Sequence, residues 1–253
     1  MLNHPTLAKL QQLKCLGMAT ALTEQMDSAD FETFTFEERL GLLVDRELTY
    51  RDDRSMSSRL RRARLRHNAC LEDIDYRTAR GLDRALLTSM ATCRWIHEHL
   101  NVLITGPTGV GKSWLACALA HQACREGYSA LYLRLPRLLT ELAIARGDGR
   151  YAKQLAAFAK VDLLVIDDWG LTVLNGDQQR DLLEVLEDRY HTRSTLVTSQ
   201  LPVEKWHGCI ADPTFADAIL DRLVHNAHKL TLKGDSLRKT AARRVGLDLS
   251  QVA

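Results

Sequence analysis

The residues best placed for chemistry form one glycine-rich run, Gly106-Pro107-Thr108-Gly109-Val110-Gly111-Lys112-Ser113, which fits the spacing G-x-x-x-x-G-K-[ST]. Its glycines allow successive backbone N–H groups to point inward at phosphate oxygens, and a helix beginning near Lys112 adds its positive N-terminal end. We expect Lys112 to reach the β- and γ-phosphates and the Ser113 hydroxyl to ligate Mg²⁺. The run predicts a site for a nucleoside triphosphate with Mg²⁺; the alternative is a glycine-rich turn with a solvated lysine.

Two acids end an apolar run, Leu163-Leu164-Val165-Ile166-Asp167-Asp168. A strand buried on both faces delivers such acids to the ligand crevice at the carboxyl edge of a parallel sheet. We assign Asp167 to Mg²⁺, directly or through water, and Asp168 to orienting and polarising the attacking water. The alternative is a pair of acids that opens a surface turn before Trp169 and Gly170.

A second polar strand end is formed by Ser199 and Gln200. Either side chain suits a sensor of hydrolysis that hydrogen-bonds the γ-phosphate or the attacking water. Arg222 follows an apolar helical stripe and suits a finger that a neighbouring subunit presents to stabilise transition-state charge. Arg189 and Arg193 are rivals for that role, and the alternative is a plain surface salt bridge.

Strand-like and helical patterns alternate from about residue 100 onward, which is typical of a parallel sheet with crossover helices. The expected strands are Leu100 to Thr105, Ala130 to Leu135, Val161 to Asp167, Ser194 to Ser199 and Lys229 to Lys233. The expected helices are Lys112 to Arg125, Pro136 to Arg146, Asp177 to Tyr190 and Asp212 to Val224. The predicted fold class is α/β, a P-loop domain with a five-stranded parallel sheet flanked by helices.

Residues 1 to 70 indicate a small all-helical domain. Leucines at helical spacing behind Pro5 predict one amphipathic helix over residues 5 to 26. A second helix begins at the capping box Thr35-Phe36-Glu37-Glu38 and continues in an apolar stripe. The arginine-rich segment 54 to 66 follows, either as a third helix with a solvated face or as a partly ordered arm. We expect two domains, residues 1 to 70 and residues 71 to 253.

Composition indicates an ordinary globular protein, since 45% of the 253 residues are hydrophobic and 26% are charged. No apolar run approaches the length of a membrane span and the N-terminus lacks a secretory signal pattern, so we expect a cytoplasmic protein without a membrane partner. The six cysteines show no metal-ligand spacing and are expected to be reduced thiols. The formal net charge is only +2, but basic residues cluster in residues 54 to 66 and 229 to 244.

Together these motifs resemble the AAA+ ATPases, in the branch of replication initiators and helicase loaders related to DnaC. Further segments resemble the IstB-like helper ATPases of transposable elements: Asp167-Asp168-Trp169-Gly170, Thr198-Ser199-Gln200-Leu201-Pro202, Trp206-His207, Asp221-Arg222-Leu223 and Gly234-Asp235-Ser236-Leu237-Arg238-Lys239. The likeness covers nearly the whole chain, including the N-terminal helical region.

The resemblance implies a Mg²⁺-dependent ATPase that forms nucleotide-dependent homo-oligomers on duplex DNA and recruits or activates a partner transposase, with ATP hydrolysis controlling assembly and release. It implies catalytic roles for Lys112, Asp168, Ser199 and Arg222. Asp168 departs from the wider AAA+ pattern, in which a glutamate with a longer reach is usual. Too few residues follow Arg238 for a full helical lid, so the resemblance assigns Arg238 no firm sensor role.

In the initiator branch an extra helix after the second strand lines the nucleic-acid path, and residues 136 to 160 take that place here. Basic side chains at such positions contact phosphates and give salt-dependent affinity with little sequence readout. The DNA-binding candidates are Arg59, Arg61, Arg62, Arg64, Arg66, Arg137, Arg146, Arg150 and Lys153. The alternative for each cluster is a solvated charged face.

Two other functions share the same nucleotide chemistry. A DnaC-like helicase loader would use residues 1 to 70 to grip a replicative helicase and would prefer single-stranded DNA. A small-molecule P-loop kinase would need a phosphoryl-acceptor site and usually an arginine-bearing lid, neither of which is visible in the sequence.

Overall fold

The computed structural model describes residues 5–78 and 80–237, so Arg238 and the end of the second basic cluster lie outside the described residues. The chain divides into two compact units between Ser58 and Arg59, within a long helix. The sequence places this boundary later, near residue 70. The Arg59 Nε donates to the Cys124 carbonyl at 2.8 Å. This contact ties Arg59 to the larger unit, so the division falls before it.

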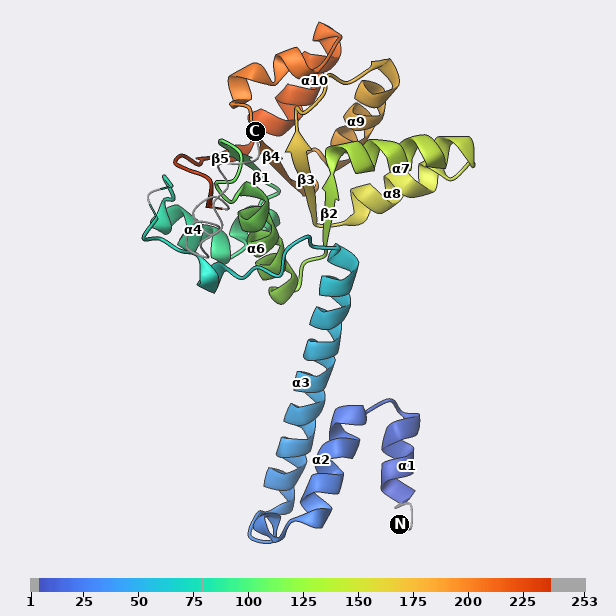
Figure 1. The fold of residues 1–253 in the computed structure, drawn as a ribbon. Coiled ribbons are helices and arrows are strands. Elements are labelled where there is room, and N and C mark those ends of the chain that lie inside the picture. The colour runs from blue at the N-terminus through green and yellow to red at the C-terminus, as the bar shows by residue number, and fades with distance from the viewer. Residues whose placement is uncertain (1–4, 79, 238–253) are drawn as a thin grey trace, which may run out of the picture. The chain divides into compact units, whose positions relative to one another are not determined.

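The N-terminal unit contains helices α1 (Pro5–Gln12), α2 (Leu16–Asp27) and the greater part of α3 (Phe36–Ala63), with the short 3-10 helix η1 (Ala29–Phe31) before α3 (Figure 1). The prediction of one helix over residues 5 to 26 is wrong. Lys14 adopts a left-handed φ of 60°, and the Cys15 N–H donates to the Leu10 carbonyl, which closes the end of α1. The leucine periodicity continues through this break, so the sequence pattern does not reveal it.

Helices α2 and α3 approach closely at Gly17, where a Cβ would lie 2.7 Å from the Arg46 carbonyl oxygen. The capping box that begins α3 is confirmed: the Thr35 N–H donates to Glu38 Oε2 at 2.8 Å, and the Glu38 N–H donates to Thr35 Oγ1 at 3.3 Å. Arginines 54 to 62 continue this helix, which ends at Ala63, and do not form a third one. The apolar stripe of α3 is exposed, at Leu40, Val44 and Leu48 among others.

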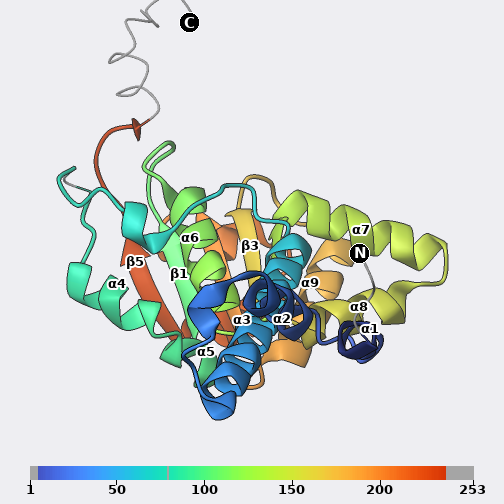
Figure 2. The same ribbon diagram turned by 90° about the horizontal axis from the view of Figure 1, so that it is seen from below.

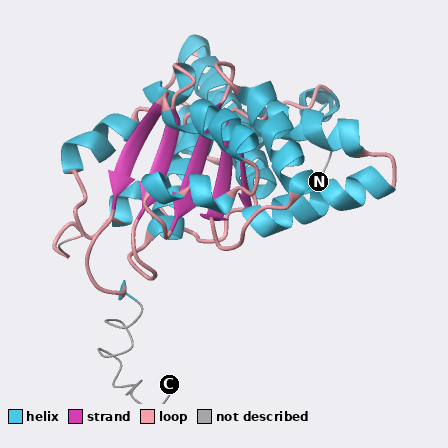
Figure 3. Ribbon diagram, turned by 90° about the horizontal axis from the view of Figure 1, so that it is seen from above, coloured by secondary structure: helices cyan, strands magenta, loops and turns pink. Residues whose placement is uncertain are grey.

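The larger unit is built on a five-stranded parallel sheet with the order β2-β3-β4-β1-β5 (Figure 3). The strands are β1 (Asn101–Thr105), β2 (Ala130–Arg134), β3 (Leu163–Trp169), β4 (Ser194–Ser199) and β5 (Ala227–Thr231). This confirms the predicted α/β class with its five-stranded parallel sheet. The bounds differ most at two strands: β3 begins and ends two residues after the predicted Val161 to Asp167, and β5 begins and ends two residues before the predicted Lys229 to Lys233.

Helices cover both faces of the sheet. They are α4 (Arg84–Ala91), α5 (Arg94–His97), α6 (Lys112–Arg125), α7 (Leu135–Gly147), α8 (Tyr151–Lys160), α9 (Gly176–Arg189) and α10 (Pro213–Val224), with the 3-10 helices η2 (Leu71–Asp73), η3 (Val203–Lys205) and η4 (His207–Cys209). Buried residues of α4 to α6 pack on one face and those of α7 to α10 on the other, with α7 and α8 side by side (Figure 2).

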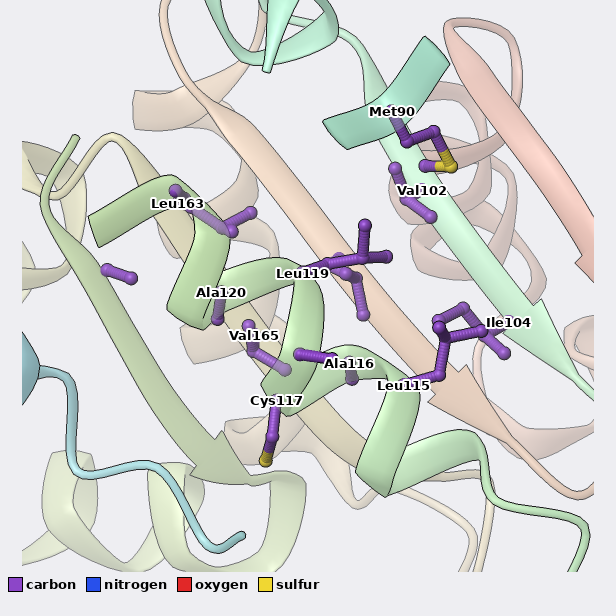
Figure 4. Packing of buried hydrophobic residues seen from close by; sticks show 14 of the residues in the cluster. Met90, Val102, Ile104, Leu115, Ala116, Cys117, Leu119, Ala120, Leu163 and Val165 are labelled. Carbon is purple, nitrogen blue, oxygen red and sulfur yellow. The ribbon is translucent and has the colours of Figure 1, made fainter. Parts of the chain in front are cut away.

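Alternation along β1 shows how both faces are filled. Val102 and Ile104 pack toward α6, whose Leu115 and Leu119 lie against them (Figure 4). Leu103, between them in sequence, belongs to the apolar cluster on the opposite face. A strand covered on both faces reads as a continuous apolar run, which is why the sequence predicts this sheet well. The covered strands then present their carboxyl ends at one edge.

Among the described helices, none is both long and apolar enough to cross a membrane. All six cysteines, which lie within the described residues, are free thiols, and four of them are buried. Burial raises the pKa of the Cys93 thiol to about 12 and also raises the pKa of Cys117 and Cys124. These buried cysteines are therefore packing residues rather than nucleophiles.

Candidate functional site

The glycine-rich run connects β1 to α6 and has the backbone that its glycines allow. Gly106 has a φ of 146°, and a Cβ there would overlap the Leu232 carbonyl oxygen. Gly111 has a φ of 98° and is the N-cap of α6, whose first turn carries no acidic side chain. The N-terminal end of α6, with its partial positive charge and its unbonded first N–H groups, is left for an anion.

Lys112 is 8% exposed and lies across this loop. Its Nζ donates to the carbonyl oxygens of Gly106 and Pro107, both at 2.7 Å. An ammonium held in this way is close to any phosphate group that the loop binds, and it can exchange carbonyl partners for phosphate oxygens. The phosphate-binding role of Lys112 stays a prediction, and it requires the ammonium to lie at the loop, as it does here.

Asp167 is fully buried at the end of β3 and joins the glycine-rich loop to the rest of the site. Its Oδ1 accepts hydrogen bonds from Ser113 Oγ at 2.9 Å and from the Thr198 hydroxyl, and its Oδ2 accepts one from the Tyr132 hydroxyl. The two predicted metal ligands, Ser113 and Asp167, therefore lie in contact.

This donor set fits Mg²⁺. A hydroxyl and a carboxylate oxygen are hard ligands, and a magnesium ion in a phosphate site takes few protein ligands and completes its shell with phosphate and water oxygens. Within the described residues there is no cluster of three or more His, Cys, Asp or Glu side chains that could hold a metal by itself. The residues therefore suit an ion that arrives with a triphosphate.

Asp168 follows at a β-bulge, where the register between β3 and β4 shifts after Ile166. Its φ is 64°, a left-handed conformation that aspartate and asparagine tolerate better than most residues. The Arg134 Nε, at the end of β2, donates to Asp168 Oδ2 at 2.6 Å. The sequence did not identify Arg134, although the parallel register of β2 and β3 pairs it with Asp167.

The predicted sensors Ser199 and Gln200 end β4 beside the loop. The Ser199 hydroxyl is already used, because it donates to the Trp169 carbonyl at 2.9 Å and accepts from the Leu201 N–H at 3.1 Å. Gln200 Oε1 instead accepts from the Thr108 hydroxyl at 2.7 Å, which links β4 to the loop. A sensor role for Ser199 stays a prediction that requires its hydroxyl to change partners.

Two cavities flank the loop, and Gly109, Lys112 and Ser113 line both. One, of about 290 Å³, also contains Asp168, Arg134 and Arg66 and holds the charged groups described above. The other, of about 300 Å³, is lined by residues from two sides of the loop, among them His67, Asp73, Asp75, Arg80 and Trp114.

Arg80 is the best-defined residue of that second cavity, and the sequence did not identify it. It is buried, and its guanidinium donates to the Asp75 carbonyl at 2.7 Å and to the Val110 carbonyl at 3.4 Å. Its Nε is buried without a hydrogen-bond partner among the described residues. A buried donor without a partner is costly, so the Nε of Arg80 is a strained point in the wall of this cavity.

The arginines predicted as fingers differ in where they lie. Arg189 is 1% exposed and donates to the carbonyls of Phe158 and Val161, so it cannot reach another subunit. Arg193 is partly exposed, with its Nε 3.6 Å from Asp162. Arg222 pairs with Glu187, and its carbonyl accepts from Asn101 at the start of β1, the end of the strand away from the loop. Arg222 therefore lies away from the glycine-rich loop of its own chain.

The two predicted DNA-binding segments lie together. Glu141 of α7 accepts from Arg137 at 2.9 Å and lies 3.9 Å from Arg64. A cavity of about 350 Å³ between these segments is lined by Arg59, Arg62 and Arg64 and by residues of β2 and α8. Arg146 pairs with Asp181, and Arg150 pairs with Asp148. The side chains of Arg61 and Lys153 are exposed. Arg66 does not lie with these segments but beside the glycine-rich loop, where its Nη1 is 3.9 Å from Asp167 Oδ2.

The comparison that decides the family is a match of residues 8–245 to the model of the IstB-like ATP binding proteins. The chain belongs to this family. An insertion sequence ATP-binding protein of Sinorhizobium fredii is 55% identical to it, over 96% of this chain and 100% of the relative. Another, from Pseudomonas aeruginosa, is 30% identical over 96% of this chain and 92% of the relative. The resemblance that the sequence motifs indicate is thereby confirmed.

Solved structures support the fold of the IstB-like chain. The crystal structure of DnaI matches 65% of this chain and 91% of its own with a TM-score of 0.56 and 21% identity. The DnaC helicase loader matches 66% of this chain and 97% of its own with a TM-score of 0.53 and 19% identity. At these identities the likeness shows a shared AAA+ fold.

Proposed function

We propose that the protein is the Mg²⁺-dependent ATPase of an insertion sequence, which assembles in its ATP-bound form on duplex DNA and there recruits or activates a transposase. The observation that carries this proposal is the contact between Ser113 and Asp167, which joins the phosphate-binding loop to the paired acids. The names of the relatives, insertion sequence ATP-binding proteins, support both the nucleotide and the setting.

In this proposal the loop and the start of α6 bind the phosphates, and Lys112 moves its ammonium from the loop carbonyls to the β- and γ-phosphates. Ser113 and Asp167 would hold Mg²⁺. When bound, the ion would supply positive charge that stabilises the charge developing on the transferred phosphoryl group. Asp168 orients the attacking water and accepts its proton, once its carboxylate is released from Arg134.

The proposed site takes one residue from a neighbouring copy. Arg222 lies away from its own loop, so we assign it to the triphosphate of the adjacent subunit. An arginine supplied in this way stabilises the transition-state charge only in the assembled form. Hydrolysis then depends on assembly, and the loss of the γ-phosphate provides the signal for release.

The nucleoside is assigned to the cavity beside Arg80 and Trp114. The indole offers a flat apolar surface for a base, and the carboxylate of Asp73 is an acceptor for an amino group. The exocyclic amino group of adenine can donate to such an acceptor, so this cavity can take the base of ATP.

Duplex DNA is assigned to the basic segments around α7 and α8, and a salt titration tests the assignment. In the presence of ATP and Mg²⁺ we expect fluorescence anisotropy to show binding to a random-sequence duplex with log K falling linearly with log salt. The double substitution Arg61→Ala, Lys153→Ala should lower the slope by about one unit for each lost phosphate contact, with no change in ATP affinity. Arg180→Ala, an exposed arginine of α9 beside Asp177, is the control.

An unchanged slope in the double variant would remove these segments from the DNA path.

The same assay, repeated with single-stranded DNA, separates the function of a transposition helper from that of a helicase loader. Stronger ATP-dependent binding to duplex DNA, together with capture of a transposase, supports the proposal. Preference for single strands with capture of a replicative helicase would replace it by the loader function.

A further inference from the structure

Arg66 lies in the segment that leads from α3 to η2, and its guanidinium reaches the end of β3. Its Nη1 is 3.9 Å from Asp167 Oδ2, and the residue lines the same cavity as Lys112 and Asp168. The side chain is 43% exposed while Asp167 is fully buried. Arg66 therefore brings a positive charge from solvent to the carboxylate assigned to Mg²⁺, although the sequence groups it with the DNA-binding arginines.

Tyr132 is a second partner of the same carboxylate oxygen. Its hydroxyl donates to Asp167 Oδ2 from β2. Guanidinium and phenol thus both reach the Asp167 carboxylate near the ends of β2 and β3.

The charges in this group do not balance without Arg66. Three hydroxyls, from Ser113, Thr198 and Tyr132, satisfy hydrogen-bonding sites of Asp167 but carry no charge. A buried carboxylate needs a positive partner as well as hydrogen bonds. Arg66 supplies that charge in the protein alone, and Mg²⁺ would supply it when a magnesium triphosphate binds. Two cations at one carboxylate repel each other.

We propose that Arg66 is the counter-ion of Asp167 in the magnesium-free protein, and that it moves away from Asp167 into solvent when magnesium takes its place. It is a positioning residue, because it acts through Asp167, and it distinguishes metal-free from metal-bound nucleotide. This inference rests on the proposed ATP site. It also assigns Arg66 to that site and removes it from the DNA surface.

The test measures binding of a fluorescent ATP analogue with Mg²⁺ and with EDTA, for the wild type, Arg66→Ala and Arg66→Lys. Removing the cation should weaken metal-free binding about tenfold and leave magnesium-dependent binding unchanged or tighter, so the ratio of the two affinities should rise at least about tenfold. Arg66→Lys keeps the charge and should restore most of the wild-type ratio. Arg180→Ala, which removes an exposed arginine of α9 beside Asp177, should match the wild type in both conditions.

Circular dichroism checks that each variant is folded, and Arg66 is exposed enough for replacement to be tolerated. A ratio that stays at the wild-type value in Arg66→Ala overturns the inference, as does a ratio that Arg66→Lys fails to restore. Failure of the proposed function looks different, because the wild type itself would then bind the analogue in neither condition. No hydrolysis is needed for any of these measurements.

Discussion

Lys112→Ala is expected to lower the affinity for ATP by about a hundredfold or more and to abolish nucleotide-dependent assembly on duplex DNA. Lys112 is almost fully buried, and its two 2.7 Å hydrogen bonds hold the ammonium at the loop to which we assign the phosphates. Loss of a charge-assisted hydrogen bond to phosphate costs about 3 kcal/mol, which corresponds to roughly that factor. Equilibrium binding of labelled ATP and electron microscopy with duplex DNA measure the two effects.

Lys205→Ala is the matched control, since Lys205 is an exposed lysine of η3 in the same unit. It should bind ATP and assemble as the wild type does. Rings or filaments formed by Lys112→Ala with ATP, at wild-type concentrations, would show that assembly does not depend on the nucleotide. Retained ATP affinity in that variant would show that the loop is not the phosphate site.

Asp168→Asn should slow ATP hydrolysis by about a thousandfold and leave ATP binding nearly unchanged, because general-base groups contribute roughly 10²–10⁴. The amide keeps the size of the side chain but cannot accept a proton from water. Asparagine also tolerates the left-handed backbone at this position, so the bulge in β3 should survive. Single-turnover phosphate release and nucleotide affinity, measured on the same sample, separate chemistry from binding.

The control for this variant is Asp177→Asn, which replaces an exposed acid in the first turn of α9. This substitution removes the same charge at a position outside the site, so the variant should hydrolyse ATP at the wild-type rate. Wild-type turnover in Asp168→Asn would contradict the assignment of the attacking water to Asp168. A loss of ATP affinity equal to the loss of turnover would make Asp168 a binding residue instead.

The fold of the larger unit could be predicted from sequence because its signals are local. Strands buried on both faces appear as continuous apolar runs, and α6 begins where the glycine-rich loop ends. The break between α1 and α2 could not, because it depends on the left-handed backbone of Lys14, for which no glycine gives a warning. The capping box of α3 was predictable since both of its partners lie within four residues.

The residues of the site also differ in whether a local sequence motif marks them. Ser113 and Asp167 were predictable because each belongs to a recognisable motif. Their contact is expected because β1, β4 and β3 are neighbouring parallel strands. Tyr132, Arg134 and Arg66 were not, because they reach the acids from other segments and carry no motif of their own. The register of β2 against β3, which aligns Arg134 with Asp167, is the signal that could have identified one of them.

Titration calorimetry of the full chain with ATP tests the central claim most directly, namely that the loop and Asp167 form one magnesium triphosphate site. We predict saturable binding of one nucleotide per chain, tighter with Mg²⁺ than with EDTA, and a loss of that magnesium dependence in Asp167→Asn. Folded wild-type protein that takes up no adenine nucleotide in the presence of Mg²⁺ would contradict the claim.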